Sequence, residues 1–170
     1  MKKFAQLFLM SLILFSCGKE KKSETEINET KESIKTVLII DGTYIKDDEI
    51  KVFYKENGYF NYDRPTVLKI TGSELIQRLR VDLPADINME NFSITATTNK
   101  EQKTLVIKGL SVEINGKLAF DGTDYKHVGY FNSDESFSWD EKNQRCNVVH
   151  TNKYPPGIVG SDKLEALLIK

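Results

Sequence analysis

Leu110-Ser111-Val112-Glu113-Ile114-Asn115-Gly116-Lys117-Leu118 decides the fold class of this chain. The residues from Leu110 to Ile114 are rich in strand formers, and Leu118 resumes an apolar pattern after the turn. Asn-Gly between two such runs is the dipeptide that tight hairpin turns prefer. The stretch therefore predicts an antiparallel β-hairpin. Upstream, Leu105 to Lys108 has the same character, and Gly109 between the two runs is expected to mark a bulge.

Further strands are expected on the N-terminal side of this hairpin. In Glu49 to Lys55, Ile50, Val52 and Tyr54 alternate with mostly polar residues, which is typical of a half-buried strand. Asn57-Gly58 predicts a turn directly after it. Phe92 to Thr97 alternates in the same way.

Three more apolar runs predict strands at Val37 to Ile40, Val67 to Thr71 and Leu75 to Leu83. Asp41-Gly42 is expected to end the first of these runs in a turn. The third run could begin as a helix, but its period of two and Pro84 favour a strand.

The C-terminal part of the chain predicts two short strands, at Phe137 to Trp139 and Cys146 to Val149, and then a helix. Ser161 or Asp162 can cap this helix, and Glu165 stands three residues after Asp162, as in a capping box. Short strands spaced by about ten residues, with turn pairs between them, predict an all-β fold. We expect one antiparallel, jelly-roll-like β-sandwich over residues 37–170, with a short C-terminal helix.

Residues 1–16 have the pattern of a bacterial lipoprotein signal, which is cut before a cysteine that then carries lipid. Lys2 and Lys3 precede a short apolar run, and Leu14-Phe15-Ser16-Cys17 ends it. The run is shorter than the roughly 20 apolar residues of a membrane-spanning helix. Residues 17–36 are then expected to begin with the lipidated Cys17 and to continue as a disordered, charged tether. Lys19-Glu20 resembles the export signal of Bacteroidota surface lipoproteins. These features predict an outer-membrane lipoprotein of the bacterial cell envelope, facing the periplasm or the surface, with the membrane as partner through its anchor.

The charge and the cysteines exclude some classes of function. The chain has 170 residues and a formal net charge of −1, and no block is basic enough to follow a phosphate backbone, so a nucleic-acid partner is not expected. Cys17 and Cys146 are the only cysteines. With lipid on the first, no disulfide is expected; Cys146 is interpreted as a small apolar residue inside a strand, the alternative being a reactive thiol.

No strong catalytic motif is present in the sequence, so an enzyme is not expected. Cys146 and His150 would share one strand face, but four residues of strand put them about 13 Å apart, too far for a catalytic pair. Asp121 and Asp124 in Asp121-Gly122-Thr123-Asp124 could offer oxygen ligands to a structural calcium ion, although a plain turn is the simpler interpretation. No other cofactor is expected.

Aromatic residues are the main candidates for ligand binding, because exposed rings can stack on sugar faces or seat a partner protein. The alternative is that these rings fill the core. The candidates are Tyr44, Tyr59, Tyr62, Tyr130 and Trp139.

Five segments in this order resemble a jelly-roll accessory domain of bacterial envelope polysaccharide proteins, similar in shape to carbohydrate-binding modules. They are Asp48-Glu49-Ile50-Lys51-Val52-Phe53-Tyr54, Asp82-Leu83-Pro84, Ile107-Lys108-Gly109-Leu110, Phe131-Asn132-Ser133-Asp134 and Tyr154-Pro155-Pro156-Gly157. The resemblance implies a β-sandwich and an envelope role, and it transfers no catalytic residue. This chain departs from the pattern in standing alone on a tether.

The sequence thus predicts a lipid-anchored, non-catalytic binding or accessory protein, with a glycan or an envelope protein as ligand. The alternatives are a polysaccharide-acting enzyme on the same sandwich and a structural subunit of an outer-membrane assembly. A shallow aromatic platform would favour a binding protein, and a groove with two facing carboxylates would favour an enzyme.

Overall fold

The computed structural model describes residues 33–169, which form twelve strands and one helix. The signal sequence, Cys17 and almost all of the expected tether lie outside these residues. In chain order the elements are β1 (Thr36–Thr43), β2 (Asp48–Glu56), β3 (Tyr59–Phe60), β4 (Thr66–Ile70), β5 (Gln77–Asp82), β6 (Asn91–Thr95), β7 (Thr104–Ile114), β8 (Lys117–Phe120), β9 (Phe131–Ser133), β10 (Phe137–Asp140), β11 (Arg145–Val148), β12 (Gly157–Gly160) and α1 (Asp162–Leu168).

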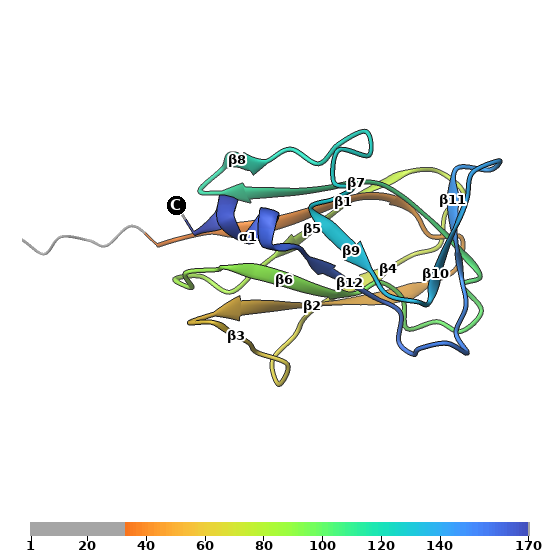
Figure 1. The fold of residues 1–170 in the computed structure, drawn as a ribbon, viewed down its shortest axis with the longest axis horizontal. Helices are drawn as coiled ribbons and strands as arrows, with labels where there is room; N and C mark the ends of the chain where they lie inside the picture. Colours follow the sequence, from red (N-terminus) through yellow and green to blue (C-terminus); the bar gives the residue numbers. More distant parts are fainter. Residues whose placement is uncertain (1–32, 170) are drawn as a thin grey trace, which may run out of the picture. The chain divides into compact units, whose positions relative to one another are not determined.

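The strands form two antiparallel sheets that face each other as a sandwich (Figure 1). The first sheet has the order β10-β11-β7-β1-β5, with β8 paired to the far end of β7. The second has the order β3-β2-β6-β12-β9, with β4 also paired to β2. The chain passes repeatedly from one sheet to the other. The predicted all-β antiparallel sandwich with a short C-terminal helix is confirmed.

The two Asn-Gly pairs form the turns that the sequence predicts. Asn115 and Gly116 both have positive φ, 51° and 73°, and join β7 to β8. Asn57 and Gly58 have φ of 52° and 82° and join β2 to β3. Positive φ at both central positions gives the turn a twist that matches the strands it connects.

The predicted turn at Asp41-Gly42 is wrong, because β1 continues through both residues to Thr43. On β1, Asp41 pairs with Gly109 of β7 and Gly42 with Ile107, so the extra residue of the bulge is Lys108, beside the predicted position. Pairing with β5 on one side and β7 on the other holds β1 extended. Tertiary pairing therefore overrides the local turn preference.

The predicted helix is present, but its predicted capping box does not form. Ser161 is the N-cap residue, yet its hydroxyl donates a hydrogen bond to the Gly129 carbonyl instead of capping the helix. The Glu165 carboxylate accepts from Lys55 at 2.6 Å and from the Asn91 amide at 3.0 Å. Glu165 thus ties α1 to the second sheet rather than closing its own first turn.

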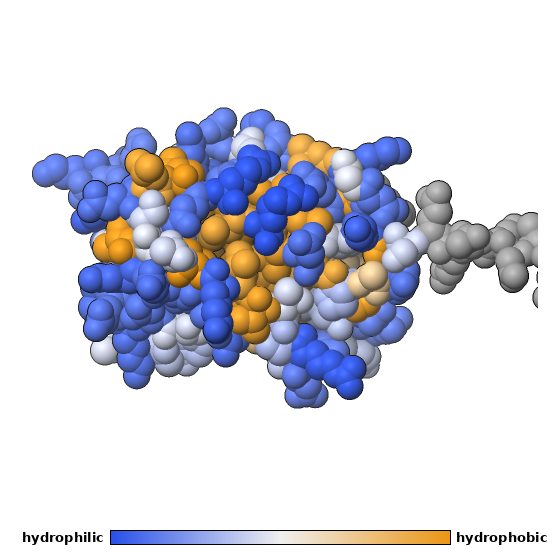
Figure 2. Space-filling view, turned by 180° about the vertical axis from the view of Figure 1, so that it is seen from behind, coloured by the Kyte–Doolittle hydropathy of each residue, from blue (hydrophilic) through white to orange (hydrophobic). Residues whose placement is uncertain are grey.

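The core lies between the sheets and includes the residues that alternation places inside, such as Ile50, Val52 and Tyr54 of β2. On the face opposite to that of Figure 1, hydrophobic atoms gather in the middle of the surface (Figure 2). The edge strands β4 and β5 lie on this side of the sandwich. The predicted strand from Leu75 begins at Gln77, and Leu75 and Ile76 before it are exposed.

Hydrogen bonds extend the folded part of the chain to Ile34, three residues before the predicted start at Val37. Ile34 and Asp86 exchange two hydrogen bonds, and Lys35 and Asn115 exchange two more. No helix within residues 33–169 has the length and apolar character to cross a membrane.

Candidate functional site

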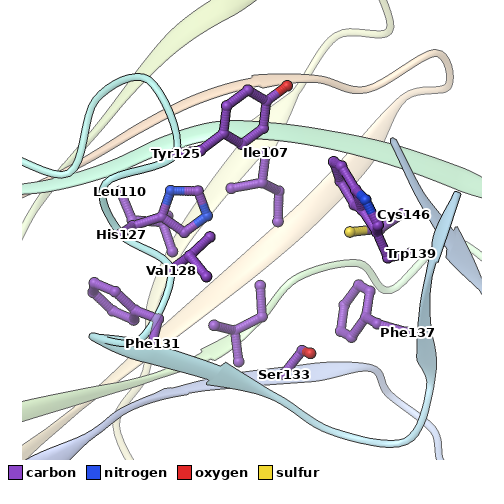
Figure 3. Close-up of a pocket in the computed structure, with 11 residues that line it drawn as sticks. Ile107, Leu110, Tyr125, His127, Val128, Phe131, Ser133, Phe137, Trp139 and Cys146 are labelled. Atoms are coloured by element: carbon purple, nitrogen blue, oxygen red, sulfur yellow. The ribbon is translucent and has the colours of Figure 1, made fainter. Parts of the chain in front are cut away.

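A cavity of about 430 Å³ opens between the sheets where β7, β10 and β11 face β9 and β12 (Figure 3). This volume lies in the range of small-molecule sites. Its lining is mainly apolar and aromatic, and contains no lysine, arginine or carboxylate. It is formed by Ile107, Leu110, Tyr125, His127, Val128, Phe131, Ser133, Phe137, Trp139, Cys146 and Ile158.

The cavity has a buried floor and an exposed apolar rim. Leu110, Phe131 and Ile158 of the floor belong to the core of the sandwich. At the rim, Val128 is 69% exposed and Trp139 is 54% exposed. Apolar side chains that stay in water around a hollow of this size are typical of a binding site.

The segment between β8 and β9, residues 121–130, forms one wall of the cavity, and its own hydrogen bonds hold it in place. The Gly122 amide donates to the buried Ser111 hydroxyl at 3.0 Å, and the Tyr125 amide donates to the Lys108 carbonyl at 2.8 Å. Gly122 packs so closely on β7 that an added Cβ would overlap the Leu110 carbonyl oxygen. The wall is therefore formed before any ligand arrives.

His127 is the most polar ring of the cavity. Its Nδ1 lies 3.3 Å from the Gly122 carbonyl oxygen, which can only accept a hydrogen bond. This contact assigns the proton to Nδ1 and leaves Nε2 as an acceptor. Burial lowers the pKa of His127, so the ring is neutral at pH 7.

Cys146 lies on β11 opposite Trp139 of β10 and lines the same cavity. It is half-buried, and burial raises the pKa of its thiol. The group is therefore a weak nucleophile at neutral pH. Its predicted place inside a strand is confirmed.

The predicted aromatic candidates fall into different environments. Trp139 lies at the rim of the cavity, with its ring 6.1 Å from that of Tyr125. Tyr130 is partly buried, and its ring packs 4.7 Å from that of Phe120. For Tyr44 the alternative of a core ring is the one the structure shows: Tyr44 is 1% exposed, and its hydroxyl donates to the Ala96 carbonyl, so this ring is not presented to a ligand. Burial raises the pKa of Tyr44.

Tyr62 contributes to a second, shallower site on the outer face of the second sheet. Its ring lies 5.2 Å from that of Phe53 and 5.7 Å from that of Phe60. Beside it is a groove of about 250 Å³ whose polar lining includes Asn132, Asp134 and Lys153. Tyr59, in contrast, is 81% exposed on the β2–β3 hairpin and lines neither site.

The two candidate calcium ligands are engaged with lysines. Asp121 accepts hydrogen bonds from Thr123 and Lys126, which hold the pKa of its carboxyl at about 2. Asp124 pairs with Lys108 at 3.4 Å. Within residues 33–169, no group of three or more His, Cys, Asp and Glu side chains is placed to hold a metal ion.

Two carboxylates that line the polar grooves are hydrogen-bonded to neighbouring loops. In the groove beside Tyr62, Asp134 accepts from the Ser136 and Gly157 amides. A further polar groove lies where the start of β2 meets residues 98–100. In it, the Asp48 carboxylate accepts hydrogen bonds from Thr97, Thr98 and Asn99. These carboxylates hold loops in place. His150 does not contact Cys146 but lies with its Nε2 2.9 Å from the Gln102 carbonyl.

Sequence reasoning missed His127, Val128 and Ser133, which line the cavity. The sequence holds one signal that could have pointed to these residues. It is the apolar run Val128-Gly129-Tyr130-Phe131, which is interrupted by a glycine and lies in a segment without strand alternation. Which residues meet across the two sheets depends on the sheet order, which no local pattern contains.

Searches against models of protein families, curated proteins and solved structures returned no match to this chain.

Proposed function

We propose that this protein is a non-catalytic binding protein of the bacterial cell envelope that holds a small apolar molecule between its two sheets. The observation that carries the proposal is the cavity of about 430 Å³, with its buried apolar floor and its exposed Val128 and Trp139 at the rim. Covering this apolar surface supplies the driving force for binding, at about 25 cal/mol per Å² of area removed from water.

The place of this function follows from the sequence pattern around Cys17. In the proposal, lipid on Cys17 anchors the chain to the outer membrane, and the sandwich binds its ligand from there. Cys17→Ser should release the protein from membranes, because it removes the residue that carries the lipid in this proposal. Fractionation checks this: a variant that still pellets with membranes and resists a salt wash would contradict the anchor.

The binding test uses N-phenyl-1-naphthylamine, a neutral probe whose fluorescence rises in apolar surroundings. We expect saturable binding to the chain from residue 17, carrying Cys17→Ser so that no lipid is attached. Ser133→Phe should weaken binding at least tenfold, because Ser133 lines the cavity and a phenyl ring would take up part of its volume.

Asn132→Phe is the matched control. Asn132 is the neighbouring residue on β9 and, by the alternation of a strand, faces the outer side of the sheet. The Asn132→Phe variant therefore adds the same ring to the same strand, but on the side that faces away from the cavity. Equal loss in the two variants, or no saturable binding to the parent protein, would overturn the proposal.

A second candidate function is glycan binding at the outer-face groove, favoured by the stacked Tyr62 ring beside polar side chains. Aromatic faces next to hydrogen-bonding groups suit the two kinds of surface on a sugar. An envelope-glycan array tests it: Asn132→Phe and Tyr62→Ala should remove binding. Val128→Ser should not, because Val128 lines the inter-sheet cavity and not this groove. No binding of the parent protein to any glycan would count against this candidate.

A further inference from the structure

The lining of the cavity is mainly apolar and aromatic, and His127 brings the lone pair of a ring nitrogen, Nε2, into it. Figure 3 shows the imidazole of His127 directed into the cavity, with the rings of Phe131, Phe137 and Trp139 around the same space. The Gly122 carbonyl occupies Nδ1. Among the described residues, no protein group is hydrogen-bonded to Nε2.

From this geometry we infer that the ligand is a neutral aromatic alcohol or phenol whose hydroxyl donates a hydrogen bond to Nε2 of His127. The inference rests on the proposed function and adds the ligand's chemical class to it. Aromatic side chains on several walls favour a flat ring, because offset and edge-to-face ring contacts are more favourable than burial alone.

The same lining argues against other ligand classes. A carboxylate or phosphate would lose its hydration in a cavity with no lysine or arginine to pair with it. A ligand with no donor would leave the Nε2 lone pair of His127 without a partner once water is displaced. A hydroxyl meets both requirements, since it is neutral and supplies one donor.

Two hydroxyl-bearing side chains line the cavity, those of Ser133 and Tyr125. The phenol hydroxyl of Tyr125 points away from the centre of the cavity in Figure 3. A hydroxyl can both donate and accept a hydrogen bond, so Ser133 adds a polar group to the lining without adding a charge.

The test compares 2-naphthol with 2-methoxynaphthalene, which has the same ring system but no donor. Using the Cys17→Ser chain, we expect calorimetry or fluorescence titration at pH 7.5 to show 2-naphthol binding about three- to tenfold more tightly, as one hydrogen bond provides. The charged analogue 2-naphthoate should bind more weakly than either.

His127→Phe keeps an aromatic ring at the position but removes the acceptor. We expect the affinity ratio between 2-naphthol and 2-methoxynaphthalene to fall to about one, because the phenyl ring offers no acceptor. If this variant loses the wall of residues 121–130, both ligands weaken together, so the ratio between them, and not either affinity alone, measures the role of His127. A variant that keeps the ratio of the parent protein would overturn the inference.

The two proposals fail in different ways. If neither naphthalene binds the parent protein, the apolar cavity is not a binding site and the proposed function is overturned. If both bind with equal affinity, the cavity is a site but His127 does not select a hydroxyl, and only this inference is overturned.

Discussion

At the scale of single residues, burial separates side chains that look alike in the sequence. Tyr44 and Tyr62 are both tyrosines near the N-terminal strands, but one is 1% exposed and the other 59%. Tyr44 follows a strand that is central to its sheet, and its hydroxyl reaches the Ala96 carbonyl across the core. That distinction depends on contacts 52 residues apart, which no local pattern contains.

The first prediction concerns Glu165, whose pKa lies below its ordinary value of 4.5, mainly because of the hydrogen bond from Lys55. A carboxyl with a lowered pKa in the folded state stabilises the fold above its unfolded pKa, and this stabilisation is lost as the pH falls through the folded pKa. Glu165→Gln should therefore be less stable than the parent protein at pH 7, and the difference should shrink below about pH 4.5.

Urea unfolding at pH 7 and pH 3 measures this difference. Glu74→Gln is the control, because Glu74 is exposed and the same charge is removed from the surface. A difference between Glu165→Gln and the parent that stays constant with pH would show that the carboxylate charge is not what holds α1 to the sheet.

At the scale of elements, alternation and turn chemistry predicted the strands of the central region well. β2, β6 and β7, and the two Asn-Gly turns, are where the pattern placed them. β9 and β12 were missed because β9 carries a single apolar residue, Phe131, and β12 begins and ends in glycine, so neither shows a strand pattern. Their strand conformation comes from tertiary pairing, since β12 pairs with β6 on one side and with β9 on the other.

The second prediction concerns the contact between residues 121–130 and β7. Gly122→Ala should lower the free energy of unfolding by roughly 2–3 kcal/mol, because the new methyl group would overlap the Leu110 carbonyl oxygen and push the segment away. The same shift moves Tyr125 and His127, so probe binding should fall as well. Urea unfolding and fluorescence titration measure the two effects.

Gly116→Ala is the matched control for this variant. It adds a methyl group at a position with φ of 73° but with open space around it, so only the backbone strain of roughly 1 kcal/mol is expected. If Gly122→Ala is no more destabilising than Gly116→Ala, the close approach of the segment to β7 does not restrict this position.

At the scale of the whole molecule, the sequence predicted the fold class but not the cavity. The sandwich follows from strand number, strand length and turn spacing, all of which are local. The cavity depends on β9 and β12 standing opposite β7, β10 and β11 with a loop closing one side. That placement is set by the sheet order, so the best candidate site lay in segments without a strong pattern.

The third prediction is that residues 33–170 fold without the rest of the chain, because the whole core cluster lies between Leu38 and Leu168. A chain starting at Thr36 should be less stable by about 1–2 kcal/mol, since it loses the hydrogen bonds of Ile34 and Lys35 with Asp86 and Asn115.

Circular dichroism and urea unfolding compare the two truncated chains. Equal midpoints would show that the hydrogen bonds before β1 do not stabilise the fold. An unfolded 33–170 chain would show that the folded unit needs residues that precede Ser33.

The pairing partners at the two ends of β7 decide where the protein can be attached to a surface. Thr36 pairs with Ile114 at one end of this strand, and Cys146 pairs with Leu105 near the other. At about 3.3 Å per residue, the start of the folded chain lies roughly 30 Å from the strand pair that carries Trp139. α1 packs against β8, so the last helix lies at the same end as Thr36 (Figure 1). An affinity tag or a sensor chip can therefore be attached directly before Ser33 or directly after Ile169 while the Trp139 side of the cavity stays accessible.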